Sequence, residues 1–235
     1  SASAVTGEES MSLGSLVHSS GAGRVQYKFS MGYHRADTFE GRDEATLRVN
    51  VPELGLDVLR GNANIQYALP QNRRLSLSGG FSDLPRYDGP FFGDRWADSE
   101  LDHNYIQFDY KGAQTTLRGY WNRNSVDMKY IKAAVDRPPL ITNVHLTSDL
   151  YNLEWLYHFN MGRSHKIISG INYSYNDSGG SLLHPDEVKP LNMTGFFFQD
   201  EWKPLKTTEV IYGARYDYHT YTHWNLSPRI VFLYH

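Results

Sequence analysis

Apolar and polar residues alternate without interruption along residues 24–34 of this chain. The odd positions are apolar or aromatic and the even positions are polar, charged or glycine: Val25, Tyr27, Phe29, Met31 and Tyr33 against Arg24, Gln26, Lys28, Ser30, Gly32 and His34. A period of two places alternate side chains on opposite faces of a β-strand. Globular strands average about 5 to 6 residues, whereas a tilted strand that crosses a bilayer needs about 9 to 11. The segment therefore predicts a strand long enough to cross a membrane.

The same alternation recurs along the chain. Long examples are 151–159, 167–175 and 209–219, and shorter candidates are 63–69, 75–81, 104–110, 114–121, 195–202 and 227–235. Charged and amide side chains occupy the second face of these segments. Such groups would be costly in the core of a soluble sandwich, but they suit a lumen filled with water or protein. We predict an all-β fold, an antiparallel transmembrane β-barrel segment of roughly 10 to 12 strands.

Short and long connections take turns between these segments. Residues 70–74, 111–113, 160–164 and 203–207 are short connections, and 82–103, 122–148 and 176–192 are long and polar. Outer-membrane barrels have short periplasmic turns and longer external loops, so the alternation also predicts sidedness. Residues 44–61 do not fit, because the up-and-down order requires them to hold either no membrane strand or two. Residues 1–10 are expected to be disordered or the start of a linker.

The aromatic content agrees with a membrane barrel. Tyr, Phe and Trp make up 14% of the chain. Tyr157, Phe159 and Trp202 adjoin the short turns. Near the long loops lie Tyr33, Tyr175, Tyr218 and Trp224. Two aromatic girdles, one at each membrane interface, would be arranged in this way. Aromatic cross-strand pairs in a soluble sheet are the alternative. Strand length and the alternating charges favour the barrel.

Composition excludes several other classes of protein. The chain has no cysteine, so it can form no disulfide framework and no metal site that uses cysteine. A net charge of -3 gives no basic footprint for nucleic acid. No run approaches the roughly 18 apolar residues of a spanning helix, and the start lacks the regions of a signal peptide. Since an outer-membrane protein must be exported, we expect the sequence to begin inside a longer chain.

No catalytic or metal-binding constellation stands out. His219 and His223 are four residues apart, a spacing that brings side chains together on a helix but not at the end of a strand. The sequence has no nucleophile elbow, His-Glu-x-x-His motif or phosphate loop. We expect no enzyme activity, no cofactor and no metal site.

Residues 82–103 are the best candidate for ligand contacts. They carry an aromatic and cationic set suited to an anionic or ring-bearing ligand: Arg86, Tyr87, Phe91, Phe92, Arg95 and Trp96. A loop that packs its own aromatic residues at the membrane surface is the alternative, and it is the commoner case. The identity of the ligand cannot be read from these residues.

Three motifs near the end of the sequence resemble the barrel of TonB-dependent outer-membrane receptors. In that family one strand commonly reads aromatic, x, Gln, Asp, x, Trp, the next reads Gly, x, Arg, Tyr, Asp, and the one after begins Ser, Pro, Arg. The matching residues are Phe197, Gln199, Asp200 and Trp202, then Gly213, Arg215, Tyr216 and Asp217, then Ser227, Pro228 and Arg229. Order and spacing match the family, whereas the upstream strands match in pattern only. Arg215 and Asp217 would face the lumen and support the wall.

The resemblance implies a barrel of about 22 strands with a plug in its lumen, embedded in the lipid of the bacterial outer membrane. It also implies binding of TonB, the inner-membrane energy transducer, through an N-terminal segment. The function implied is uptake of a scarce solute: a siderophore or other metal chelate, cobalamin or a glycan. No plug or TonB-binding segment precedes Met11, and the Ser-Pro-Arg motif, mid-barrel in the family, falls within the last nine residues. We expect residues 1–235 to be a barrel-domain fragment, the first half of the barrel, with the plug absent.

Two alternatives remain open. A passive porin-like barrel of roughly 10 to 12 strands would be complete as given and would fold alone in detergent. An open half-barrel would instead expose two strand edges, which cannot face lipid unpaired. A membrane-bound hydrolase would need a convergent nucleophile and base, and no such pair stands out.

Overall fold

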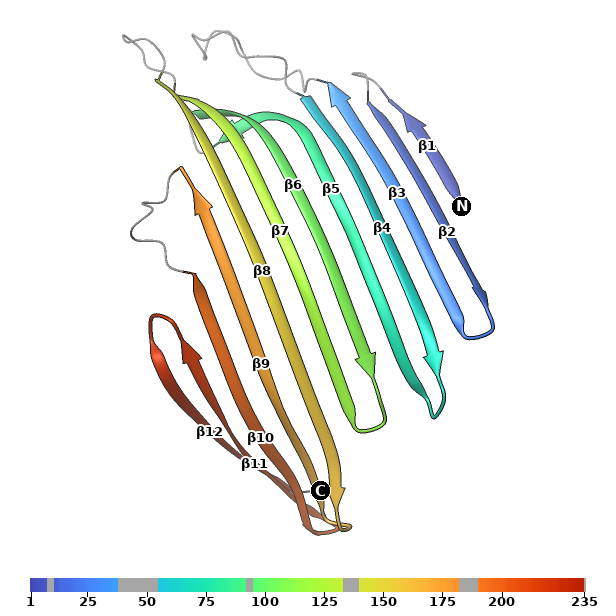
Figure 1. Cartoon of the computed structure of the whole chain (residues 1–235), viewed down its shortest axis with the longest axis vertical. Helices are drawn as coiled ribbons and strands as arrows, with labels where there is room; N and C mark the ends of the chain where they lie inside the picture. Colours follow the sequence, from blue (N-terminus) through green and yellow to red (C-terminus); the bar gives the residue numbers. More distant parts are fainter. Residues whose placement is uncertain (8–10, 38–54, 92–94, 133–139, 182–189, 235) are drawn as a thin grey trace.

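The computed structural model describes residues 1–7, 11–37, 55–91, 95–132, 140–181 and 190–234. They form one antiparallel sheet of 12 strands in which every strand pairs with its neighbours in sequence (Figure 1). The strands are β1 (Ala2–Thr6), β2 (Ser12–Ala22), β3 (Val25–Asp37), β4 (Gly55–Leu69), β5 (Arg73–Phe91), β6 (Arg95–Lys111), β7 (Thr115–Lys132), β8 (Leu140–Met161), β9 (His165–Gly180), β10 (Leu191–Leu205), β11 (Thr208–His219) and β12 (His223–Tyr234). The predicted all-β antiparallel fold is confirmed. Within these ranges no helix is long and apolar enough to cross a membrane.

The sheet has one end at which strands close through tight turns, which we name the turn end. The connections there are 23–24, 70–72, 112–114, 162–164 and 206–207. Gln71, Asn72 and Gly162 adopt positive φ, a backbone conformation that the tightest hairpins require at their central positions. All four short connections predicted from the sequence are confirmed.

At the opposite end, which we name the extended end, β5 continues to Phe91 beyond Tyr87, its last residue paired with β4, and β8 begins at Leu140, before Leu146, its first residue paired with β9. β8 has 22 residues and β5 has 19, against 12 in β11 and in β12. Much of 82–103, 122–148 and 176–192 is therefore strand, and the prediction of long loops there is wrong for the described parts. A hairpin that meets water on both faces needs no apolar alternation, so the sequence gives no periodic signal.

A bulge in β5 accommodates Pro85. The register of β5 shifts between Leu84 and Tyr87 against β6, and that of β4 shifts between Asp57 and Leu59 against β5. Proline has no N–H to donate, and within a sheet it is tolerated at an edge or a bulge. The bulge therefore lets β5 continue as a central strand beyond Pro85.

The first two strands are absent from the sequence-based prediction. Ala2–Thr6 pairs with β2, and β2 pairs with β3 along its whole length. The expectation of disorder or a linker is therefore wrong for Ala2–Thr6, whereas residues 8–10 lie outside the described residues. β2 is rich in Ser and Gly, so its own alternation is weak. Pairing with the strongly patterned β3 fixes its position.

Residues 55–61 form the first half of β4, continuous with the predicted strand 63–69. This part of 44–61 thus adds no strand of its own, which is one of the two outcomes that the up-and-down order allows. Residues 44–54 lie outside the described residues. The strands that bring the total to 12 are β1 and β2.

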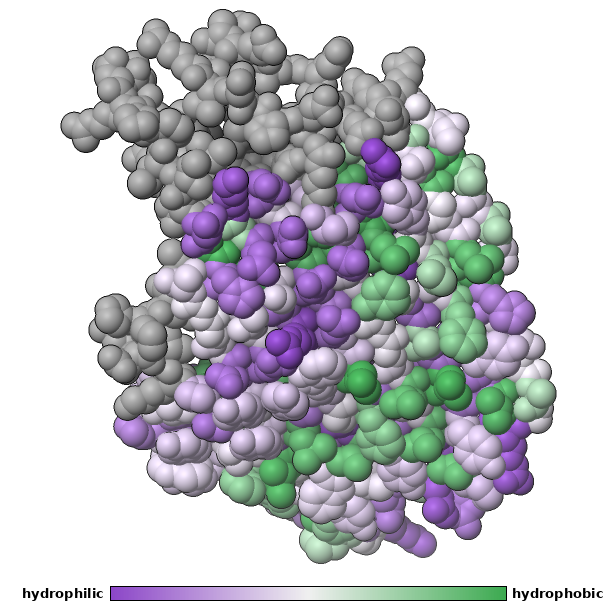
Figure 2. Space-filling view, turned by 45° about the horizontal axis from the view of Figure 1, so that its top comes forward, coloured by the Kyte–Doolittle hydropathy of each residue, from purple (hydrophilic) through white to green (hydrophobic). Residues whose placement is uncertain are grey.

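The strand register gives the sheet one apolar and one polar face. Tyr27, Ile65, Leu77 and Phe108 lie side by side on the apolar face of β3 to β6. Figure 2 shows hydrophobic side chains as a band that crosses the strands between hydrophilic regions. On β3 this band covers Val25 to Tyr33, about 26 Å of strand, or roughly 20 Å of height at the usual tilt. That height is close to the apolar band of outer-membrane barrels.

The apolar face has almost no protein packed against it. Among the described residues only Ala36, Val144 and Ile167 are buried apolar side chains, whereas Met31 is 52% and Ile106 is 53% exposed. A continuous apolar surface of this kind needs a covering. Lipid supplies it, so the polar face is the one that lines the lumen.

Candidate functional site

Hydrogen bonds tie side chains together across the polar face. Asn64 Nδ2 on β4 donates to Ser76 Oγ at 3.2 Å and to Ser78 Oγ at 2.7 Å on β5. Tyr105 OH on β6 donates to Asn62 Oδ1 on β4 at 2.9 Å. It can reach across β5 because Gly80 has no side chain, and a Cβ there would collide with Asn62 and the Tyr105 ring. This network holds the polar side chains of three strands in place.

From β7 to β11 the charges on the polar face are matched in pairs. Arg118 Nε lies 2.8 Å from Asp109 Oδ1 on β6, and Arg118 Nη1 lies 4.0 Å from Glu154 Oε2 on β8. Further along the sheet the pairs are Lys166 with Glu201, Lys203 with Glu209, and Arg215 with Asp217. This part of the wall is close to electrically neutral.

Strands β3 to β6 differ, because their polar face carries cations without matching acids. Between the level of Arg60 and the turn end, the register places five cations on it: Arg24, Lys28, Arg60, Arg74 and Lys111. Among the described residues of these four strands, Asp109 is the one acid on this face, and it already pairs with Arg118. None of the five cations has an ion-pair partner in the part of the chain that the structure describes. The lumen wall is therefore positive along β3 to β6.

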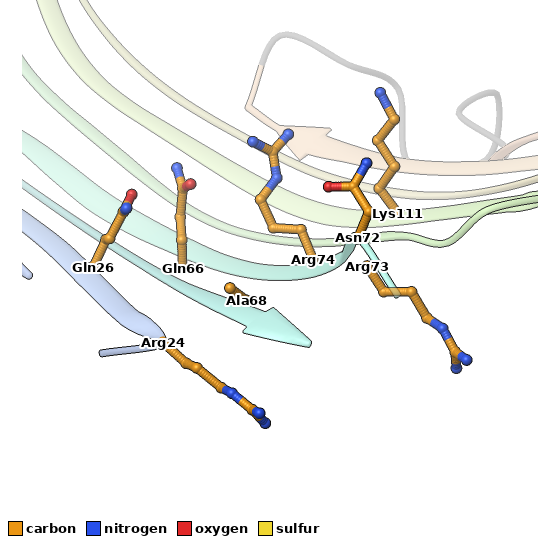
Figure 3. Close-up of a pocket in the computed structure, with 8 residues that line it drawn as sticks. All are labelled: Arg24, Gln26, Gln66, Ala68, Asn72, Arg73, Arg74 and Lys111. Carbon is orange, nitrogen blue, oxygen red and sulfur yellow. The ribbon is translucent and has the colours of Figure 1, made fainter. Parts of the chain in front are cut away.

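Three of these cations, Arg24, Arg74 and Lys111, line a cavity of about 340 Å³ at the turn end, which we name the basic pocket. In Figure 3 the side chains of Arg74 and Lys111 extend to the same side, whereas that of Arg24 extends away from them. Its lining residues are Arg24, Gln26, Gln66, Ala68, Asn72, Arg73, Arg74 and Lys111. Arg74 and Lys111 are direct cross-strand neighbours, and like charges in that position repel. The small Ala68 lies between Arg24 and Arg74 and leaves space there. The pocket is suited to an anion with several oxygens, such as a carboxylate or phosphate.

The residues predicted to contact a ligand lie on the extended hairpin of β5 and β6 and not in a loop. The backbone register places Arg86 opposite Asp57, Phe91 opposite Arg95, and Trp96 opposite Pro90. Tyr87 lies opposite Ser99 and is 39% exposed. Phe92 lies outside the described residues. The hairpin thus brings the two parts of this set, 86–91 and 95–96, next to each other at the extended end.

The first family motif builds a buried contact at the turn end of the apolar face. Asp200 is 2% exposed. Its Oδ2 accepts a hydrogen bond from Tyr212 OH at 2.7 Å and lies 2.7 Å from His165 Nδ1. The Trp202 ring stacks on the His165 ring, with centroids 5.9 Å apart. Within the described residues the other carboxyl oxygen, Oδ1, has no hydrogen-bond partner.

The second and third motifs join β10, β11 and β12. Gln199 lies opposite Gly213, and Arg215 Nε donates to both carboxylate oxygens of Asp217 at 2.8 Å. Tyr216 stacks on Trp224, with centroids 4.6 Å apart. On β12 the residues opposite Arg215, Ala214 and Gly213 are Ser227, Pro228 and Arg229. The Arg215–Asp217 contact is within β11 and the others join neighbouring strands, as expected for a structural role.

His219 and His223 lie opposite each other at the β11–β12 hairpin. Across the described ranges no three His, Asp or Glu side chains are arranged as metal ligands. Backbone Tyr221 N donates to His219 Nδ1 at 3.2 Å, so this ring takes part in the turn.

Sequence reasoning missed the basic pocket. Its cations flank three separate turns, and only the strand register shows that Arg24, Arg74 and Lys111 share one row of the sheet. A signal was present, because each of the three continues the polar side of its strand's alternation directly beside a short turn. Polar positions next to turns are common, which is why one strand alone does not reveal the row.

Comparison with solved structures shows the same fold at low sequence identity. Similar chains are FpvA of P. aeruginosa in complex with an iron-bound pyoverdine, the outer membrane transporter YddB of Escherichia coli, and the ferric-catecholate import receptor Fiu of E. coli K12. Their TM-scores are 0.63, 0.61 and 0.59, at 11%, 11% and 13% identity. The matches cover 97%, 94% and 93% of this chain and 37%, 35% and 44% of theirs. The chain thus spans less than half the length of these structures.

A family model described as "TonB dependent receptor-like, beta-barrel" matches residues 26–235. A search of curated proteins found no match. The family model covers β3 to β12 almost completely, and the apolar band and tight turns of these strands are those of an outer-membrane barrel. The chain belongs to the TonB-dependent receptor family and forms part of its β-barrel in the outer membrane of Gram-negative bacteria.

Proposed function

We propose that this chain is part of the wall of an active transporter that imports a scarce solute with energy supplied through TonB. The observation that carries the proposal is the match of the family's barrel over residues 26–235. Members of the family are transport receptors and not enzymes, and nothing about the described wall favours a passive pore. In this setting the turn end is the periplasmic side and the extended end is the external side.

A metal chelate is the first solute class to test, ahead of cobalamin and glycans. The similar structure of FpvA holds an iron-bound pyoverdine, and Fiu is a ferric-catecholate import receptor. At their low identity these structures share only the fold, so they suggest the class and do not specify the ligand. The partners in this proposal are the solute, the membrane lipid and TonB, which would act through another part of the protein.

The transport proposal predicts uptake that depends on TonB. A bacterial strain that lacks its own receptors, and that expresses the full-length protein, should accumulate one solute from a panel of labelled ferric catecholate, ferric hydroxamate, ferric citrate and cobalamin. Deleting tonB should reduce that accumulation to the level of the empty strain, because a plugged lumen does not conduct solute without energy. Accumulation that is equal with and without TonB would reject active transport and favour a porin-like pore.

The external hairpin is proposed as part of the ligand site, through Arg86, Tyr87, Phe91, Phe92, Arg95 and Trp96. If it is, replacing Tyr87 by Ala should weaken binding of the transported solute to the purified full-length protein by about tenfold, the loss typical of an aromatic anchor. Tyr33→Ala on β3 is the matched control, because Tyr33 has similar exposure but lies on the lipid-facing side. Equal affinity in both variants would assign Tyr87 to packing alone.

A further inference from the structure

The five cations on the polar face of β3 to β6 form a series that descends toward the periplasmic side. Arg60 lies opposite Gly32, Lys28 is four residues nearer the turn end of β3, and Arg24 is four residues nearer still. Four residues of strand span about 13 Å. The series ends in the basic pocket, where Arg74 and Lys111 join Arg24. Positive charge is therefore present at three successive levels of the wall.

Apart from Asp109, which pairs with Arg118, the described acids of the same strands lie on the other side of the sheet. The register puts Asp57, Asp83 and Asp102 on the lipid-facing side, at the external end. The sheet lies between these acids and the cations, so they do not form ion pairs with them. A narrow path lined by one sign of charge concentrates ions of the opposite sign by about 10- to 1000-fold.

Geometry favours binding at the pocket over a diffuse charge effect. Three arginines and one lysine line the same cavity, together with the side-chain amides of Gln26, Gln66 and Asn72. In Figure 3 Arg74 and Lys111 extend to the same side as these amides, whereas Arg24 and Arg73 extend away from them. Guanidinium and amide N–H groups donate to carboxylate or phosphate oxygens with well-defined geometry. The cavity volume of about 340 Å³ suits a small polyanion.

We infer that β3 to β6 form a path for an anionic solute along the lumen, and that the basic pocket binds the solute's carboxylate or phosphate groups at the periplasmic end. This inference rests on the proposed transport function, and it specifies the charge of what is transported. The main rival occupant is an acidic part of the protein itself, seated against the same cations.

A single introduced cysteine tests the pocket without requiring transport. This chain has no cysteine of its own, and Ala68 lies on the polar face between Arg24 and Arg74. Ala68→Cys is placed in the full-length protein, freed of any other cysteine, in detergent. Its reaction rates with a sulfonate-bearing and a trimethylammonium-bearing methanethiosulfonate are measured, and Ser174→Cys on the polar face of β9 is the reference.

For each position, the rate with the anionic reagent is divided by the rate with the cationic reagent. We expect this ratio to be at least about tenfold higher at position 68 than at position 174. Adding Arg74→Gln and Lys111→Gln should remove most of that difference, and so should high salt. Citrate should slow the reaction at position 68 in the unsubstituted background, and this protection should be lost in the double Gln variant. Trehalose, a neutral solute, should give no protection.

Equal ratios at the two positions, or no protection by citrate, would overturn the inference and identify the protein's own acids as the partners of these cations. Folding of each variant is checked by its heat-dependent mobility on a gel. If the Gln variants do not fold, the salt dependence of the unsubstituted protein decides. The two proposals can fail separately. If the protein shows no TonB-dependent uptake but labelling at position 68 still favours the anionic reagent, the transport proposal is rejected and the anion site is retained.

Discussion

Replacing Asp200 by Ala is expected to lower the free energy of unfolding of the barrel by about 2 to 4 kcal/mol. Tyr212 OH donates to the Asp200 carboxyl group at 2.7 Å, and His165 Nδ1 lies at the same distance. Both partners are on the lipid-facing side, where no water replaces a lost hydrogen-bond partner. Each unsatisfied group costs about 1 to 3 kcal/mol. The substitution also removes Asp200 Oδ1, which is buried without a hydrogen-bond partner, and this offsets part of the lost free energy of unfolding.

The measurement is urea unfolding of the protein in detergent, followed by its mobility on an unheated gel, with a double-mutant cycle as the internal test. In Asp200→Ala combined with Tyr212→Phe no hydroxyl is left unpaired. The double variant should therefore lose at least about 1 kcal/mol less than the sum of the two single losses. Thr194→Ala is the matched control, since it lies on the same face of β10. Strict additivity, or an Asp200→Ala variant as stable as the control, would contradict this account.

The membrane-facing part of the fold could be predicted because one rule governs it. Where one face meets lipid and the other the lumen, every second residue must be apolar, and β3, β8 and β11 follow that rule over nine or more residues. Tight turns favour residues that tolerate positive φ, and Gly162 and Asn72 adopt it here. These two signals were enough to locate most of the strands and the short connections.

The rest of the fold could not be predicted because its cause is not local. β2 is held by its pairing with β3, and the external halves of β5 to β8 are held by pairing with each other in water. Neither situation imposes an apolar period. Asp200 shows the same limit at the site: its motif is visible in the sequence, but its burial depends on His165 from β9 and Tyr212 from β11.

The basic pocket depends on register in the same way. A shift of one residue between β5 and β6 would move Lys111 to the lipid-facing side and end its contact with Arg74. The pocket therefore exists only in the register in which β3, β4, β5 and β6 pair, and of these pairings the turn at 70–72 fixes that of β4 with β5. This dependence explains why the pocket's residues are unremarkable when they are read one strand at a time.

Replacing Gly213 by Val is expected to destabilise the barrel by about 3 kcal/mol or to prevent its folding. A Cβ at Gly213 would collide with the backbone of β10, at the Phe198 carbonyl oxygen and the Gln199 Cα. A flexible side chain could move aside, but a strand backbone held by hydrogen bonds on both sides cannot. The steric cost therefore exceeds the gain of about 0.5 to 1 kcal/mol from the reduced freedom of the unfolded chain.

Gly119→Val provides the matched comparison for this steric argument. Gly119 is also in the middle of a central strand, but a Cβ there would meet Leu153 Cδ1 at 3.6 Å, an ordinary contact on the apolar face. Valine favours strands and lipid, so this variant should unfold within about 0.5 kcal/mol of the unsubstituted protein. Unfolding in urea measures both variants on one scale. If the two valines cost the same, the loss reflects glycine in strands generally. A loss confined to Gly213 means that the second family motif keeps a glycine because β10 and β11 approach too closely for any side chain.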